Sequence, residues 1–107
     1  MVAIKVIDFE SLSKKAENVG QIIETEIQLL SKLNHKSIIK YYGTFISDNK
    51  LNIVLEYCVG GSLLKMRQLY QNLNENLIRK YTTQILEGIE YLHSHNIIHS
   101  DIKCANI

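Results

Sequence analysis

Two adjacent glycines, Gly60 and Gly61, separate a part of the sequence with strand patterns from a part with helix patterns. Before them, short runs of β-branched and aromatic residues are bounded by polar turn residues, which is typical of strands. After them, apolar residues recur at steps of three and four, which is the spacing of an amphipathic helix. Since a Gly-Gly pair favours a flexible joint, the sequence predicts an α+β chain with a sheet before the joint and helices after it.

The part before the glycines predicts three strands and one helix. Strands are expected over Val2–Ile7, Ile38–Phe45 and Leu51–Glu56, with a bulge or a close backbone approach at Gly43. A helix is expected over Gln21–Leu33, because its apolar residues fall on one arc. A polar loop joins the first strand to this helix, and a hairpin joins the last two strands. These elements predict a small antiparallel sheet with one face covered by the helix.

Glu26 is the exception to the pattern of that helix, because it lies on the apolar arc. A carboxylate in such a place is costly unless it has a partner. One interpretation places Glu26 at the edge of the helix contact, where it reaches water. The other pairs it with a cation, and Lys5 in the first strand is the candidate. The residues alone leave both interpretations open.

The part after the glycines predicts two helices, over Leu63–Tyr70 and Glu75–His93, with Ser62 and Asn74 as their N-caps. One face of the longer helix carries Gly88 and an apolar stripe, formed by Ile78, Tyr81, Ile85, Ile89 and Leu92. Few other segments are available to cover this stripe. We therefore expect exposed apolar surface, poor solubility and a need for a partner or a further domain.

The final stretch carries the densest set of polar side chains. An apolar pair, Ile97 and Ile98, leads directly into Asp101, with Lys103 two residues later and Asn106 five residues later. This pattern predicts a buried strand that delivers three polar side chains into one loop.

These motifs together resemble the protein kinase superfamily. Val-Ala-Ile-Lys at 2–5, a glutamate on the next helix, a Gly-Gly joint and Asp-x-Lys-x-x-Asn at 101–106 occur in that family's order, over essentially the whole chain. The lysine two residues after the aspartate is typical of serine/threonine kinases. The residues at 41–45, 56–63 and 99–107 are most similar to those of the MAP-kinase-kinase-kinases and related upstream kinases. The resemblance runs from the lysine of the third family strand to the asparagine of the catalytic loop.

The resemblance implies a fold and a set of residue roles. The fold is a partial kinase fold, with residues 1–56 in the small lobe, 57–62 as the hinge and 63–107 beginning the large lobe. Catalysis is assigned to Asp101 as base and Lys103 as phosphate stabiliser. Asn106 is assigned as a ligand of Mg²⁺. ATP binding is assigned to a further set of residues, which are Ala3, Lys5, Glu26, Leu55, Glu56 and Cys58, with Lys5 and Glu26 as an ion pair.

Two departures from the family pattern bear on activity. The usual His-Arg-Asp is His-Ser-Asp here, so Ser100 cannot make the arginine's paired contact with a phosphorylated residue. The glycine-rich loop, the Asp-Phe-Gly motif and the activation loop lie outside the 107 residues, so we expect this chain alone to be inactive. Two hypotheses stay open: a segment of a serine/threonine kinase, or a truncated kinase-like protein that acts only by binding another protein.

Composition excludes several other classes. With 12 basic and 11 acidic residues the net charge is +1, which lacks the one-sided excess of a nucleic-acid or membrane-surface binder. Apolar runs long enough to cross a membrane are absent, and so is a signal-peptide pattern. Two cysteines without CxxC spacing indicate a reducing compartment. We therefore expect a cytoplasmic protein whose partners are a protein substrate or another kinase.

Overall fold

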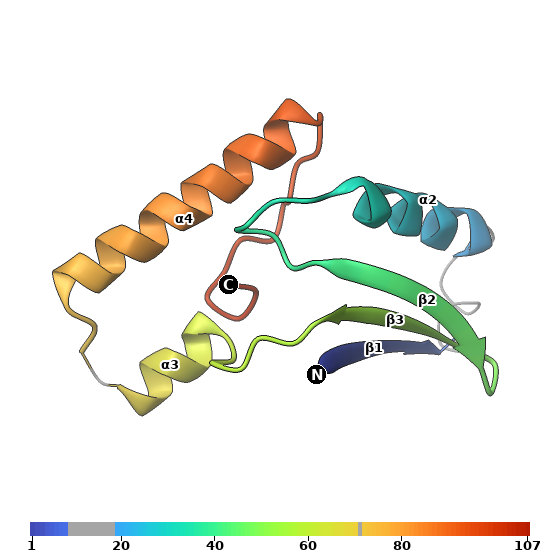
Figure 1. Cartoon of the computed structure of the whole chain (residues 1–107), viewed down its shortest axis with the longest axis horizontal. Coiled ribbons are helices and arrows are strands. Elements are labelled where there is room, and N and C mark those ends of the chain that lie inside the picture. Colours follow the sequence, from blue (N-terminus) through green and yellow to red (C-terminus); the bar gives the residue numbers. More distant parts are fainter. Residues whose placement is uncertain (9–18, 71) are drawn as a thin grey trace. The chain divides into compact units, whose positions relative to one another are not determined.

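The computed structural model describes residues 1–8, 19–70 and 72–107 (Figure 1). These residues form two compact units, one of residues 1–34 and 38–57, the other of residues 35–37 and 58–107. The elements in chain order are β1 (Val2–Asp8), α2 (Val19–Lys32), β2 (Tyr41–Ser47), β3 (Lys50–Glu56), α3 (Leu63–Leu69) and α4 (Glu75–Ser94). Most of the loop expected over residues 8–20 lies outside the described residues. An α+β architecture is confirmed.

The first unit contains a three-stranded antiparallel sheet in the order β1-β3-β2. Its centre is β3, where Leu51 and Ile53 are only 4% and 2% exposed. Asn52 is also buried there, and its Nδ2 donates to the Lys50 carbonyl at 3.2 Å. Because β3 has a neighbour on both sides, its alternating apolar residues supply most of the core of this unit.

The register of β2 shows both what the sequence predicted and where it was wrong. A bulge between Tyr41 and Gly43 confirms the expected irregularity at the glycine. The strand begins at Tyr41, however, and not at Ile38. Just before it, the Lys40 amide donates to the Glu56 carboxylate at 3.2 Å. A side chain therefore occupies the place of a backbone acceptor, and regular pairing starts one residue later.

Helix α2 packs on the sheet, with its main contact on β2. It begins at Val19, two residues earlier than its apolar pattern predicted. The expected covering of one sheet face by this helix agrees with the deep burial of Ile53. Apolar side chains on the alternate positions of β1 stay about half exposed, with 50% for Ile4 and 56% for Val6. One face of the sheet is therefore covered better than the other.

Both helices of the second unit have the N-caps that the sequence predicted. The Ser62 hydroxyl accepts from the Lys65 amide at 3.3 Å, and the Asn74 amide oxygen accepts from the Leu77 amide at 2.8 Å. Each cap satisfies one of the amides that the first turn of a helix leaves without an internal partner.

The apolar stripe of α4 is covered unevenly. Gly88 and Leu92 are buried, whereas Ile78 is 48% exposed and Leu86, outside the predicted stripe, is 60% exposed. The segment 35–37 supplies part of the cover near the end of the helix, where the His35 ring stacks on Tyr91 with centroids 4.8 Å apart. Of the predicted stripe only Ile78 is exposed, because Tyr81, Ile85 and Ile89 are half-buried, and the exposed Leu86 lies outside the stripe.

A salt bridge also holds this segment to α4, nearer the start of the helix than Tyr91, since Lys36 Nζ lies 2.9 Å from Glu87 Oε2.

Within residues 1–8, 19–70 and 72–107, no helix combines the length and the apolar character that crossing a membrane requires.

Gly61 has a backbone conformation that other residues adopt at a cost. Its φ is +71°, and a Cβ there would lie 2.9 Å from Lys65 Cδ, whereas Gly60 has open space around it. We expect Gly61→Ala to lower the free energy of unfolding by about 1–2 kcal/mol, and Gly60→Ala to change it much less. Denaturant unfolding followed by circular dichroism measures both. Equal effects of the two substitutions would contradict the expectation.

Candidate functional site

The segment that carries the polar motif leaves α4 through a hydrogen-bonded turn. The amides of His95 and Ile97 both donate to the Leu92 carbonyl, each at 3.0 Å. The buried strand predicted at Ile97–Ile98 is wrong: the segment has no strand pairing, and Ile98 is 78% exposed. A strand needs a neighbouring strand, and in the described part of the chain all strands belong to the first unit.

Asp101, Lys103 and Asn106 converge in one loop. Lys103 Nζ lies 2.9 Å from Asp101 Oδ2. Asn106 Nδ2 donates to the same carboxylate oxygen and to the Asp101 carbonyl, both at 2.9 Å. A further bond from the Asn106 amide to the Lys103 carbonyl, at 2.8 Å, closes the turn between them. The loop thus holds a carboxylate, an ammonium and an amide within hydrogen-bonding distance of one another.

The charge of Asp101 is stabilised by these partners. The Lys103 ammonium, and after it the Asn106 amide, lower the pKa of the Asp101 carboxyl below its ordinary value of 3.8. Asp101 is open to solvent, with 60% of its side chain exposed. At neutral pH this loop therefore presents an ionised carboxylate to water, as a residue that accepts a proton requires.

The lowered pKa predicts how the loop responds to acid. Since the Asp101 pKa is lower in the folded than in the unfolded chain, the carboxylate stabilises the loop above pH 3.8. This contribution is lost as the pH falls through the folded-state pKa. Amide hydrogen exchange of residues 99–107 at a series of pH values, corrected for intrinsic rates, measures this loss of loop stability. The Asp101→Asn protein is measured in the same way for comparison. A loop whose protection has the same pH dependence in both proteins would contradict the expectation.

Ser100 has a left-handed backbone conformation, with a φ of +56°. Such a value is uncommon for a residue other than glycine, asparagine or aspartate. The turn is accompanied by a bond from the Asp101 amide to His99 Nδ1 at 3.3 Å. Ser100 itself is exposed. The residue that departs from the kinase pattern therefore lies at a sharp turn directly before Asp101.

Three of the predicted nucleotide-binding residues lie on one face of the sheet. Ala3 pairs with Leu55 and Lys5 pairs with Ile53 across β1 and β3. Directly opposed residues of antiparallel strands point to the same face, and so do alternate residues along one strand. The side chains of Ala3, Lys5 and Leu55 therefore share a face.

The predicted ion pair between Lys5 and Glu26 is not formed in this structure. Among the described residues, ion pairs within 4.0 Å join Lys36 to Glu87, Arg79 to Glu75 and Lys103 to Asp101. Glu26 is exposed, which fits the interpretation that it reaches water. Helix α2 makes its main contact with β2, and β3 lies between β2 and the strand that carries Lys5.

The predicted joint has two defined features around Glu56 and Cys58. The Glu56 amide donates to the Lys40 carbonyl at 2.8 Å, which ties the end of β3 to the first unit. The Cys58 carbonyl accepts from the Gly61 amide at 3.0 Å, which forms a tight turn before α3. Cys58 is a free, exposed thiol.

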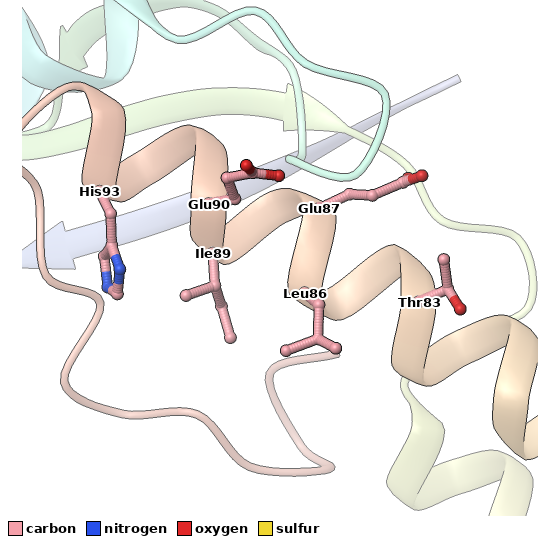
Figure 2. Close-up of a pocket in the computed structure, with 6 residues that line it drawn as sticks. All are labelled: Thr83, Leu86, Glu87, Ile89, Glu90 and His93. Atoms are coloured by element: carbon pink, nitrogen blue, oxygen red, sulfur yellow. The ribbon is translucent and has the colours of Figure 1, made fainter.

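A shallow hollow lies on the surface of α4, apart from the motif residues (Figure 2). Its lining is Thr83, Leu86, Glu87, Ile89, Glu90 and His93. Leu86, Ile89 and His93 follow one side of the helix, and the two glutamates follow another. The described residues contain no cluster of three or more His, Cys, Asp or Glu side chains that could hold a metal ion. Sequence reasoning did not single out this hollow, because Leu86 falls outside the predicted stripe.

Known proteins are similar to this chain over its whole length. The protein kinase domain family matches residues 1–107. The chain is 47% identical over its full length to the mitogen-activated protein kinase kinase kinase YODA of Arabidopsis thaliana, and covers 12% of that protein.

Two further relatives point the same way. The chain is 44% identical over 99% of its length to human mitogen-activated protein kinase kinase kinase 3, and covers 17% of it. It is 42% identical over 99% of its length to cell division control protein 7 of Schizosaccharomyces pombe, and covers 10% of it. The chain thus spans less than a fifth of each of these relatives.

Proposed function

Because this chain belongs to the protein kinase domain family, we propose that it serves, within a full-length protein, to transfer the γ-phosphate of ATP to a serine or threonine hydroxyl of another protein. The observation that carries the proposal is the loop in which Asp101, Lys103 and Asn106 bond to one another. Phosphoryl transfer depends on positioning and on electrostatic stabilisation more than on covalent chemistry. A carboxylate, a cation and an amide oxygen in one loop supply part of the positioning and part of the electrostatic stabilisation.

Each side chain of the loop has a role that its contacts support. Asp101 is ionised and exposed, so it can orient the accepting hydroxyl and take its proton. Lys103 has an exposed ammonium that can move from Asp101 to a phosphate oxygen, because both are anionic acceptors of similar geometry.

Asn106 is the residue that fits a magnesium ion. Its Nδ2 donates to the carbonyl and to the carboxylate of Asp101, so the amide oxygen points away from the Asp101 carboxylate. Mg²⁺ prefers oxygen ligands and is usually held by few protein groups together with substrate phosphates. The ion, when bound, would neutralise charge that develops on the transferred group. The chain's own contribution is to hold the Asn106 amide in place through Asp101.

Nucleotide binding is assigned to the other predicted residues. Lys5 would contact the α- and β-phosphates, on the sheet face that it shares with Ala3 and Leu55. The backbone of Glu56 and Cys58 would contact the adenine edge. Glu26 would support Lys5 through an ion pair that is not formed in this structure.

The partners and the location that we propose concern the whole protein, and the relatives support them. Two of the three relatives reported above are named as mitogen-activated protein kinase kinase kinases, one from Arabidopsis thaliana and one from humans. We propose that the full-length protein acts in a cytoplasmic signalling cascade of that type, with another protein kinase as substrate.

The proposal is tested by phosphate transfer from labelled ATP to a generic protein acceptor. The full-length protein should label serine or threonine, and Lys103→Met should reduce the rate by at least about a hundred-fold. Lys80→Met, an exposed lysine on α4, is the matched control and should leave the rate unchanged. No transfer by the parent protein would favour the alternative, a kinase-like protein that acts only through binding.

Ser100 predicts that activity does not depend on phosphorylation of the activation loop. A serine lacks the fork of donors with which arginine binds a phosphate in a bidentate pair. Treatment of the full-length protein with a phosphatase should therefore leave its rate unchanged, whereas Ser100→Arg should make the rate sensitive to the treatment. A large loss of rate on dephosphorylation with Ser100 in place would contradict the expectation.

A further inference from the structure

The first turn of α3 is bonded to the loop that carries the catalytic motif. The Leu64 amide donates to the Cys104 carbonyl at 2.8 Å, and the Leu63 amide donates to the Ile107 carbonyl. All four residues belong to the second unit, and Figure 1 shows the end of the chain curled beside the start of α3. Two elements far apart in sequence are therefore joined by backbone bonds that side-chain patterns do not reveal.

These amides are available because they begin a helix. The first four amides of a helix lack an acceptor within the helix. In α3 the first bond of the helix itself runs from the Met66 amide to the Ser62 carbonyl. Of the amides before Met66, that of Lys65 donates to the Ser62 hydroxyl, and those of Leu63 and Leu64 donate to the loop. The cap at Ser62 thus orders the turn whose free amides hold the loop.

The loop carbonyls that accept these bonds flank Asn106. Asn106 lies between Cys104 and Ile107 in the sequence. Its side chain donates to the Asp101 carboxylate, which also pairs with the Lys103 ammonium. Fixing the carbonyls on both sides of Asn106 limits the rotation of its amide. It thereby limits the position of the Asp101 carboxylate to which that amide is bonded.

We propose that Ser62 is a positioning residue for the Asp101–Lys103–Asn106 loop, acting through the two amides of the first turn of α3. The catalytic part of this proposal rests on the proposed kinase function, and the structural part does not. Because Ser62 directly follows Gly61, a ligand or partner that rearranges the turn at 58–61 would reach the loop by this route. Regulation at the joint would then act on the rate of transfer.

The first experiment compares two cap substitutions by amide hydrogen exchange on the full-length protein. Ser62→Ala removes the cap of α3 and should raise exchange of residues 101–107 about five-fold, which is the expected effect of losing one cap. Ser62→Asn restores a good capping group and should restore protection. Asn74→Ala removes the equivalent cap of α4 and is the matched control, because no bond from that end of α4 reaches residues 101–107 in the described structure.

A second pair of substitutions removes one of the bonds directly. Leu63→Pro deletes the amide that donates to Ile107 at the first helical position, where proline is tolerated. The preceding residue is already extended, with φ −87° and ψ 162° at Ser62, as a residue before proline must be. Leu63→Ala loses the side chain but keeps the amide. The proline variant should therefore expose the loop to exchange more than the alanine variant does.

Kinetics then separate positioning from general loss of structure. Ser62→Ala should lower kcat about five-fold while the KM for ATP stays the same, and Ser62→Asn should restore kcat. Faster exchange confined to residues 62–66, with residues 101–107 unchanged in Ser62→Ala and Leu63→Pro, would overturn the proposal. So would an equal effect of Asn74→Ala on the loop. If the parent protein shows no transfer at all, the proposed function fails, and the exchange experiment still decides whether Ser62 positions the loop.

Discussion

Asp101→Asn is expected to lower kcat for phosphoryl transfer by about a hundred-fold or more, the usual contribution of a positioned general base. Asparagine has nearly the same shape and its amide oxygen can still accept the bond from Asn106, so the loop keeps its form. It cannot take a proton from the accepting hydroxyl, and it no longer pairs electrostatically with Lys103. Steady-state transfer to a protein acceptor measures kcat, and a fluorescent ATP analogue measures nucleotide affinity.

Comparing the change in kcat with the change in nucleotide affinity decides whether Asp101 acts as the general base. Nucleotide affinity should stay within about two-fold, since the proposed contacts of Asp101 are with the hydroxyl and not with the nucleotide. Asp48→Asn is the matched control, because Asp48 is exposed in the β2–β3 turn and has a φ of 51° that asparagine tolerates. Parallel losses of affinity and kcat would count against Asp101 as the base.

Ile53→Ala is expected to have the largest effect on stability, lowering the free energy of unfolding by about 2–5 kcal/mol. Ile53 is 2% exposed at the centre of the middle strand, with Lys5 opposite it on one side and Thr44 on the other. Truncation leaves a cavity between the sheet and its cover, and the described core has few other buried side chains to close it. Denaturant unfolding followed by circular dichroism measures the loss.

Ile46→Ala makes the same chemical change in the same sheet and is the control. Ile46 is 69% exposed near the end of β2, so its truncation should change the free energy of unfolding by no more than about 0.5 kcal/mol. Similar losses from the two substitutions would show that the unit has no core at Ile53.

Local features of the sequence predicted local features of the structure. The caps at Ser62 and Asn74 set the starts of α3 and α4, because a cap involves residues only three apart. The cluster of Asp101, Lys103 and Asn106 was predictable for the same reason, since all three lie within six residues of one loop. The bulge at Gly43 likewise follows from a single residue.

Features that depend on distant segments were predicted less well. The pair of Ile97 and Ile98 has the composition of a strand, but composition does not say whether another strand lies beside it. The Lys5–Glu26 contact depends on where α2 lies over the sheet, which neither residue determines. The late start of β2 depends on the Glu56 carboxylate, which is sixteen residues away from the Lys40 amide that it binds.

β1 is an edge strand of the described sheet, which has a consequence for experiments on Lys5. In a protein made of these 107 residues, β1 pairs only with β3 among the described strands, so the other side of its backbone offers donors and acceptors to any extended chain that approaches. Lys5 is the only charge among the residues from Val2 to Ile7, and charged side chains are a common protection of such strands against self-association. Lys5→Met in these 107 residues would leave an uninterrupted apolar strand, and aggregation would then lower the apparent affinity for a nucleotide without any lost contact. Lys5→Arg keeps the charge and is the substitution that isolates the contact with the nucleotide.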